Sequence, residues 1–242
     1  MWKLFVLAFL VGTFAELIDG TLGMAYGVTS TSFLLTIGLT PAMASASVHT
    51  AEVFTTLASG ISHFKAGNVD IGLFKKLVVP GCIGATVGAY LLTEIPIWFI
   101  EPTVNIYLSI MGVVIILKIF NINLIMRKAN KACLGGIGGF IDAIGGGGWG
   151  PVVTTTLIAE GNNPVKVIGS VNLAEFLVTL CESLTFFTLL GLQNLHIILG
   201  LMVGGVVAAP LGAVVCKRIP RKYLTLIIGI LIIFLSVRRL IA

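Results

Sequence analysis

Apolar runs separated by short polar stretches follow one another along nearly the whole chain. Runs of about 20 residues are long enough to cross ~30 Å of hydrocarbon as helices. Such runs predict membrane spans at about 43–62, 71–93, 102–120, 168–190, 197–216 and 223–240. Shorter apolar pieces, broken by glycine, lie at 4–18, 27–38, 132–141 and 149–159. This pattern predicts an all-α integral membrane protein.

The chain consists of two copies of one unit. A shift of 123 positions superposes 19–57 on 142–180 without a gap and gives thirteen identical pairs. We therefore assign 1–122 to a first repeat and 123–242 to a second repeat of a single transmembrane domain. In each repeat a pair of short helices, broken or re-entrant at glycine, precedes three spans. Internal repeats of this kind are the usual construction of secondary transporters.

The positions of lysine and arginine distinguish two arrangements of the glycine breaks. If each break is a re-entrant hairpin, the two repeats have inverted topology, both termini lie outside, and 12 of the 15 Lys and Arg residues lie on one side. If the broken helices cross the membrane, the division is ten to five. Because Lys and Arg concentrate in cytoplasmic loops, the charge pattern favours the inverted hairpins, with crossing helices as the alternative.

Composition excludes several classes of protein. Charged residues make up 10% of the chain and hydrophobic residues 57%, with a mean hydropathy of +1.08, whereas soluble domains carry about 25% charged residues. The net charge of +5 fits cytoplasmic Lys and Arg that orient the spans, so we expect a lipid bilayer and no nucleic acid as partner. The four cysteines have no short spacing. We expect no disulfide framework, metal site, cofactor or enzymatic nucleophile.

The two glycine breaks are the first candidate site. Backbone amides at membrane depth need a partner, and the helices that start after each break would direct positive ends and free amides to the bilayer centre. Donors without a nearby Lys or Arg suit a small anion; the alternative is that the glycines only allow close helix packing. We predict substrate contacts at Gly145, Gly146, Gly147, Gly148, Trp149, Gly150, Thr154 and Asn172, and at Gly23, Tyr26, Gly27, Thr31 and His49.

Carboxylates inside apolar stretches are the second candidate. These residues are Glu16, Asp19, Glu52, Asp142, Glu175 and Glu182. An ionised carboxylate at the bilayer centre costs about 2.5–3.5 kcal/mol even on the gentler insertion scales. Asp19 and Asp142 directly precede the breaks, where aspartate accepts turn amides, so we predict that they are structural caps.

Glu52 and Glu175 occupy equivalent positions in the two repeats. Each lies three residues after His49 or Asn172, on the same face of a helix. They are candidates for proton coupling, with a buried hydrogen-bonded pair as the alternative. Glu182 aligns with Ser59 and receives no role.

The sequence around both breaks resembles the TauE/SafE family of membrane permeases. The resemblance rests on residues 15–27, 38–41, 63–70 and 139–151 and covers nearly the whole chain. It implies transport, in many members export, of sulfite, thiosulfate or organosulfonates across a bacterial inner membrane.

The leading hypothesis is a secondary transporter that exports a small sulfur-containing anion. The substrate would lie between the two breaks, and alternating access would come from movement of one half against the other. A cation permease that uses the intramembrane carboxylates and a non-transporting membrane subunit are the alternatives. The sequence leaves open the particular anion, the direction of transport, the coupling ion and the oligomeric state.

Overall fold

The computed structural model describes residues 2–117 and 128–215, together with 226, 230, 233, 234, 237 and 241. Within these residues all regular structure is helical. The elements are α1 (Trp2–Leu22), α2 (Tyr26–Thr36), α3 (Pro41–Lys65), α4 (Ile71–Glu94), α5 (Ile97–Leu117), α6 (Lys131–Gly145), the π-helical turn η2 (Gly150–Thr154), α7 (Thr155–Ala159), α8 (Pro164–Leu190) and α9 (Leu195–Val215). The predicted span 223–240 lies outside the described residues, apart from single positions.

Four of these helices are long and apolar enough to cross a membrane: α1, α4, α8 and residues 195–214 of α9. The expectation of a short first piece at 4–18 is wrong, because α1 continues to Leu22. Helix α1 ends at the residue before Gly23, which has a positive φ of 68°.

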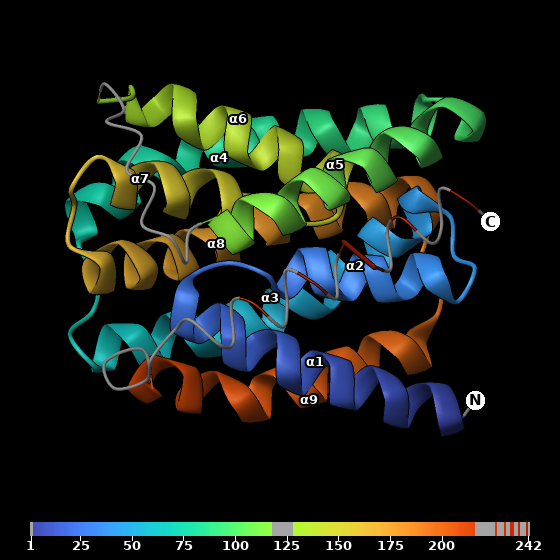
Figure 1. Ribbon diagram of the computed structural model, residues 1–242, viewed down its shortest axis with the longest axis horizontal. Coiled ribbons are helices and arrows are strands. Elements are labelled where there is room, and N and C mark those ends of the chain that lie inside the picture. Colours follow the sequence, from blue (N-terminus) through green and yellow to red (C-terminus); the bar gives the residue numbers. More distant parts are fainter. Residues whose placement is uncertain are drawn as a thin grey trace.

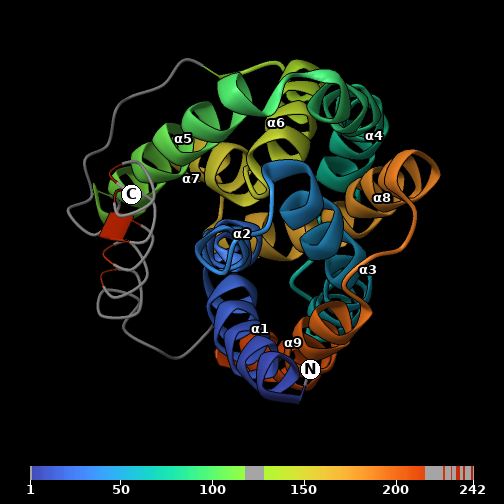
Figure 2. The ribbon, with the colours of Figure 1, turned by 90° about the vertical axis from the view of Figure 1, so that its right-hand side faces the viewer.

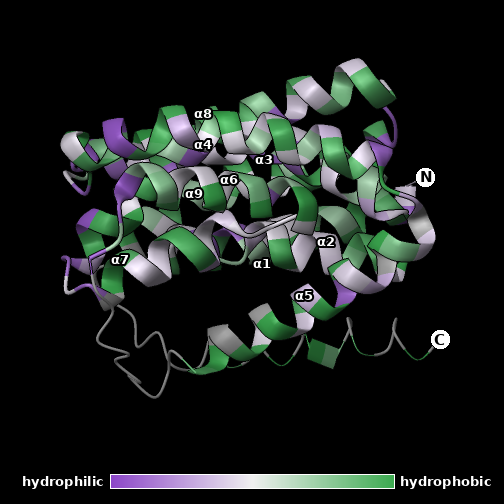
Figure 3. Ribbon diagram, turned by 90° about the horizontal axis from the view of Figure 1, so that it is seen from above, coloured by the Kyte–Doolittle hydropathy of each residue, from purple (hydrophilic) through white to green (hydrophobic). Residues whose placement is uncertain are grey.

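Helix α3 covers the predicted span 43–62, but its Ser, Thr, His and Glu residues make it too polar to be among the four. Hydrophilic residues gather most strongly at the end of the bundle near α7 (Figure 3).

The two long central helices, α3 and α8, begin at equivalent prolines. The Thr40 hydroxyl accepts the Met43 amide just before Pro41, and the Asn163 side chain accepts two amides just after Pro164. Proline suits the first turn of a helix because the missing N–H has no intrahelical acceptor there. The polar residue before each proline supplies the cap. Both helix starts thus follow from the local sequence around each proline.

The chain reverses direction at both glycine breaks. The outer ends of α1 and α2 lie at one end of the bundle, and those of α6 and α7 lie at the other (Figure 1). Side-chain contacts agree with this view. Lys166 Nζ donates to the carbonyl oxygens of Gly67 and Val69, and the Ala129 amide donates to Glu160. The loops 66–70, 128–130 and 160–163 therefore lie together at the α7 end.

Each repeat contributes one long helix to the other. Helix α4 packs mainly on α6 and α8, and α9 packs mainly on α1 and α3. Glycines allow these close approaches: a Cβ on Gly88 would lie 2.6 Å from the Phe140 carbonyl oxygen, and one on Gly20 would lie 3.0 Å from Gly212 Cα. The small-residue faces of α4 and α9 thus serve helix packing.

This exchange produces two groups of helices. We call α1, α2, α3 and α9 the first bundle, and α4, α6, α7 and α8 the second bundle. The two bundles meet chiefly along α3 and α8. In a view along the long axis, α2 lies near the centre and the long helices surround it (Figure 2).

Candidate functional site

The two chain reversals, at residues 23–27 and 146–150, meet inside the molecule. We call them the first tip and the second tip. A Cβ on Gly27 would lie 2.6 Å from Gly147 Cα, so the backbones are in direct contact. Thr154 Oγ1 donates to the Gly23 carbonyl oxygen at 2.7 Å, and the Thr31 hydroxyl donates to the Gly146 carbonyl oxygen. Thr31 and Thr154 are equivalent positions of the repeats, as are Gly23 and Gly146. The two tips are therefore joined by one contact that occurs twice.

At both tips an aspartate side chain accepts hydrogen bonds from backbone amides. Asp142 Oδ1 accepts the amides of Gly148 and Trp149 at 2.5 and 2.9 Å. At the equivalent place, Asp19 Oδ1 accepts the Tyr26 amide at 3.3 Å. These are the contacts that a structural cap makes. The expectation that these amides are free is therefore wrong, because carboxylates of the protein accept their hydrogen bonds.

Trp149 and Tyr26, at equivalent positions, attach each tip to a long helix. Trp149 Nε1 donates to the Val171 carbonyl oxygen of α8, and the Tyr26 hydroxyl donates to the Leu201 carbonyl oxygen of α9, each at 3.2 Å. Both side chains are buried. Their polar atoms are thus bonded to protein in this state.

Tyr107 of α5 covers the second tip. Its hydroxyl donates to the Gly147 carbonyl oxygen at 2.9 Å. Its ring and hydroxyl fill the space that a side chain at Gly145 or Gly148 would need. This residue was missed by the sequence reasoning, because an isolated tyrosine in an apolar span has the same pattern as an interfacial anchor.

Ionisable side chains gather beside the tips, where α3, α6 and α8 come together. His49 Nε2 lies 3.0 Å from Glu182 Oε2, and 3.8 Å from both Asp142 Oδ2 and Glu52 Oε2. All four side chains are buried. The structure therefore brings the predicted residues His49, Glu52 and Asp142 together and adds Glu182, to which the sequence reasoning gave no role.

A neutral version of the His49–Glu182 contact joins the two repeats at the equivalent place. The residue equivalent to His49 is Asn172, and the residue equivalent to Glu182 is Ser59. Ser59 Oγ donates to Asn172 Oδ1 at 2.8 Å, and Asn172 Nδ2 donates to the Ile168 carbonyl oxygen at 3.0 Å. Asn172, predicted to contact substrate, is thus hydrogen-bonded within the protein in this state.

Comparison with known proteins identifies the family. The family model described as "Sulfite exporter TauE/SafE" matches residues 8–239. The chain belongs to the TauE/SafE family. A curated relative from Bacillus subtilis (strain 168), "Probable membrane transporter protein YtnM", is 42% identical over 252 residues, which cover 100% of this chain and 84% of the relative. No solved structure gives a significant match.

Membership of the TauE/SafE family confirms the resemblance seen in the sequence and makes the chain a membrane transporter. Together with its four apolar helices, this identifies a multi-pass inner-membrane protein. The ionisable side chains described above therefore lie in the interior of a transporter. Charged side chains in such a place usually belong to ion or substrate pathways.

The interior of this TauE/SafE protein carries an excess of acidic groups. Six carboxylates are buried: Glu16, Asp19, Glu52, Asp142, Glu175 and Glu182. Among the residues that the structure describes, no lysine or arginine side chain is buried with them. Glu16 Oε1 and Glu175 Oε2 also find no hydrogen-bond partner there. Protons or bound cations must balance this negative charge, because an unpaired buried charge costs several kcal/mol.

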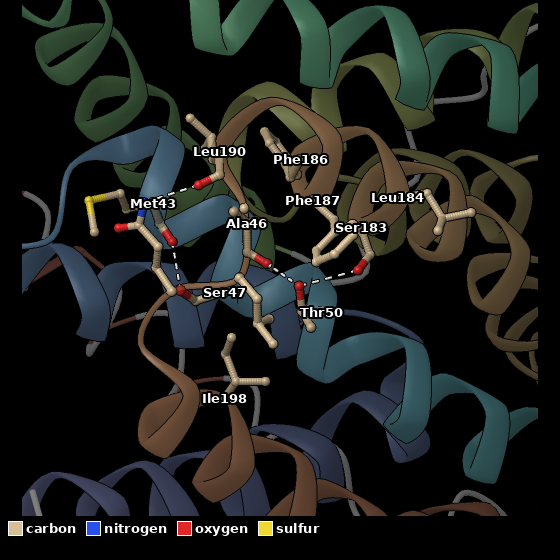
Figure 4. Close-up of a pocket in the computed structure, with 13 residues that line it drawn as sticks. Met43, Ala46, Ser47, Thr50, Ser183, Leu184, Phe186, Phe187, Leu190 and Ile198 are labelled. Carbon is tan, nitrogen blue, oxygen red and sulfur yellow. Dashed lines mark hydrogen bonds between the residues drawn. The ribbon is translucent and has the colours of Figure 1, made fainter.

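A pocket of about 110 Å³ lies at the α8–α9 end of the TauE/SafE fold. It is lined by residues of α3, α8 and α9, and its Thr50 and Ser183 hydroxyls are 3.2 Å apart (Figure 4). Phe186 lines the pocket and also stacks on the His49 ring, with centroids 6.2 Å apart. The phenyl ring thus separates this pocket from the ionisable side chains. None of the predicted substrate residues lines it.

Proposed function

We propose that this protein is a secondary transporter that exports a small sulfur-containing oxyanion or sulfonate by alternating access. The observation that carries the proposal is the direct contact of Gly27 with Gly147, where the two chain reversals meet. Glycine-broken helices that meet inside a bundle are the usual substrate site of duplicated transporters. The family description, which names a sulfite exporter, supports the class of substrate.

The substrate would bind between the tips after they separate. Separation breaks the two threonine–carbonyl bonds and lets an anion replace Asp142 on the amides of Gly148 and Trp149. An oxyanion can accept from these amides as the carboxylate does. The close contact of the tips then represents a state in which the site is closed.

Exchange of labelled anion across proteoliposomes tests the substrate. We expect sulfite, thiosulfate or a small sulfonate to exchange, and the same anion to raise the melting temperature of the purified protein. Thr154→Val should lower exchange severalfold, whereas Thr154→Ser, which keeps the hydroxyl, should retain it. If none of these anions is exchanged or raises the melting temperature, the proposed substrate class is wrong.

We further propose that the repeats have inverted topology in the membrane, with the α7 end cytoplasmic. Two observations support this orientation. The outer ends of α1 and α2 lie at the opposite end of the bundle from those of α6 and α7 (Figure 1), and most Lys and Arg residues fall on one side. In a cysteine-free background, cysteines at Lys65 and Lys166 should be labelled from the cytoplasm, and one at Gln193 from outside. Labelling of Lys65→Cys and Gln193→Cys from the same face would contradict it. Arg218, a further site for this test, lies outside the described residues.

The moving units are proposed to be the two bundles rather than the two sequence halves. Movement by halves would separate α1 from α9 and α4 from α6, whose backbones are in contact at glycines. Movement by bundles leaves both contacts intact and changes the α3–α8 interface.

A native pair of cysteines distinguishes these movements. The side chains of Cys82 on α4 and Cys181 on α8 interact with each other. A disulfide between them joins the two sequence halves but stays within the second bundle, so anion exchange should persist after oxidation. Thr50→Cys with Ser183→Cys, in a Cys82→Ala/Cys181→Ala background, joins the two bundles and should stop exchange reversibly. The opposite pattern would show that the halves move.

Glu52 and Glu175 are proposed to carry the coupled proton. Each is buried and has one oxygen without a hydrogen-bond partner among the described residues. Glu52→Gln should flatten the pH dependence of anion exchange, and Glu175→Gln provides the matched change in the other repeat. An unchanged pH profile in both variants would reject the assignment.

A further inference from the structure

Three side chains in the interior surround a common point. His49 Nε2, one Asp142 oxygen and one Glu182 oxygen all lie within 4.8 Å of one another. The distances from Nε2 are 3.0 Å to Glu182 Oε2 and 3.8 Å to Asp142 Oδ2, and Glu52 Oε2 is also at 3.8 Å. Ligand atoms of a tetrahedral metal with bonds of about 2.0–2.1 Å stand about 3.3 Å apart. The spacing therefore suits an ion held between these atoms.

The same atoms lack hydrogen-bond partners. Among the described residues, His49 Nε2, Asp142 Oδ2, Glu52 Oε2 and both Glu182 carboxylate oxygens are buried without one. Glu182 Oε2 is near enough to Nε2 for a hydrogen bond, but the pair does not have the required alignment. These buried atoms are therefore available to bind an ion.

The other ring nitrogen determines which tautomer His49 adopts. Nδ1 lies 2.8 Å from the Ser45 carbonyl oxygen. Because a carbonyl oxygen only accepts, Nδ1 carries the hydrogen and Nε2 of the neutral ring is left with a free lone pair. A histidine that donates one N–H to a backbone carbonyl and presents its other nitrogen is the usual arrangement of a metal ligand.

We propose that His49, Asp142 and Glu182 bind a divalent transition-metal ion. One nitrogen and two carboxylates suit Zn²⁺, Co²⁺ or Mn²⁺ better than Mg²⁺ or Ca²⁺, which favour oxygen alone. The ion offsets two negative charges in an interior where the described residues bury six carboxylates. This proposal differs from the sequence-based expectation of no metal site.

Asp142 connects the ion site to the tips. Its Oδ1 holds the Gly148 and Trp149 amides, and its Oδ2 faces His49. A cation at Oδ2 draws negative charge away from Oδ1 and weakens its hold on the amides. This step rests on the proposed function: binding of the cation favours replacement of Asp142 by the anion, so the two ligands bind cooperatively.

Cobalt titration of the purified, metal-free full-length protein tests the site without any transport assay. We expect one Co²⁺ per chain and the visible absorption of cobalt with nitrogen and oxygen ligands. Glu182→Gln should weaken Co²⁺ binding at least tenfold. The double variant His49→Asn/Glu182→Ser should abolish it, and this variant reproduces the Asn172–Ser59 pair that the fold already accommodates.

Two carboxylates outside the ligand set serve as controls. Glu175→Gln, also buried, and Glu160→Gln, in the α7–α8 loop, should change Co²⁺ affinity less than threefold. Absence of stoichiometric Co²⁺ binding, or equal binding by wild type and Glu182→Gln, would overturn the proposal. A changed pH profile of transport in Glu182→Gln without Co²⁺ binding would also overturn it and assign a proton to the cluster.

The outcomes for metal and anion are separable. Co²⁺ binding without added anion tests the ion site alone, and failure of sulfite, thiosulfate or sulfonate exchange leaves that result unchanged. Sulfite should raise Co²⁺ affinity in wild type if Asp142 links the two sites. Equal Co²⁺ affinity with and without sulfite would remove the link.

Discussion

The same interhelical contact occurs twice in this transporter with opposite chemistry. On one side, Ser59 and Asn172 form a neutral pair in which both oxygen and nitrogen of the amide are hydrogen-bonded. On the other side, His49 and Glu182 are ionisable and leave polar atoms without partners. The neutral copy shows what the fold needs at this place, so the ionisable copy has chemistry that the fold does not require.

Contacts at the tips differ less between the repeats. Thr31 and Thr154 make equivalent hydroxyl–carbonyl bonds, and Asp19 and Asp142 both accept an amide from the opposite side of their break. These tip contacts are thus shared by the two repeats, whereas the pair beside the tips is not. A duplicated scaffold with one altered pair is a simple way to build an asymmetric ion site.

The largest effect should come from charging the neutral copy. Asn172→Asp removes the bond to the Ile168 carbonyl oxygen and places a carboxylate in a fully buried position. We expect a loss of about 3–5 kcal/mol in the free energy of unfolding, because an uncompensated buried charge is strongly destabilising. Unfolding in mixed detergent micelles measures the loss.

A matched change separates charge from hydrogen bonding in this copy. Ser59→Ala removes the donor to Asn172 Oδ1 without adding a charge and should cost about 1–2 kcal/mol. Equal losses for Asn172→Asp and Ser59→Ala would show that the neutral character of this copy is unimportant.

The opposite change in the ionisable copy should have a smaller effect of opposite sign. In metal-free protein, Glu182→Gln removes a buried carboxylate whose two oxygens have no hydrogen-bond partner among the described residues. We expect the free energy of unfolding to rise by about 1–2 kcal/mol. Saturating Co²⁺ should reverse the order, because a bound ligand stabilises only the protein that binds it. Destabilisation of the metal-free variant would contradict the contrast between the copies.

Local features of this fold could be predicted from sequence. Pro41 and Pro164 begin helices because proline and its preceding cap act within one turn. The glycines of α4 and α9 mark close packing because their spacing places them on one helix face. The breaks themselves were visible as glycine runs next to aspartate. Each of these inferences needs only neighbouring residues.

Features that depend on distant residues could not be predicted in the same way. The exchange of α4 and α9 between repeats follows from packing across the whole molecule. Glu182 was given no role because its equivalent in the first repeat is Ser59. The side chains near it, His49 and Asp142, lie on other helices, so the sequence does not show that they meet.

The two tip bonds provide a test of near-equivalence. Thr31→Val and Thr154→Val each remove one hydroxyl donor to a carbonyl oxygen of the other tip. Each should lower the free energy of unfolding by about 1 kcal/mol. Detergent unfolding of both variants, with the matching Thr→Ser changes as controls, measures the effect. A large loss from one variant and none from the other would extend the asymmetry to the tips.

The smallest effect should come from an acidic residue whose oxygens all have partners. Glu160 accepts the Ala129 amide and pairs with Lys131 at the α7 end. Burial raises the pKa of Glu160, but the hydrogen bonds from Lys131 and Ala129 outweigh it, so the pKa lies below the usual value for glutamate. Glu160→Gln should therefore cost at most about 1 kcal/mol at pH 7.

The pH dependence of this loss has a definite sign. Because the pKa is lower in the folded protein, Glu160 adds stability above its unfolded-state pKa of about 4.3. That contribution disappears as the pH falls through the lower folded-state pKa. Melting temperatures of wild type and Glu160→Gln should thus differ at pH 7 and converge on acidification, whereas Glu94→Gln, an exposed control, should show little difference throughout. A difference that persists at low pH would mean that Glu160 contributes by packing and not by charge, unlike the ionisable copy beside the tips.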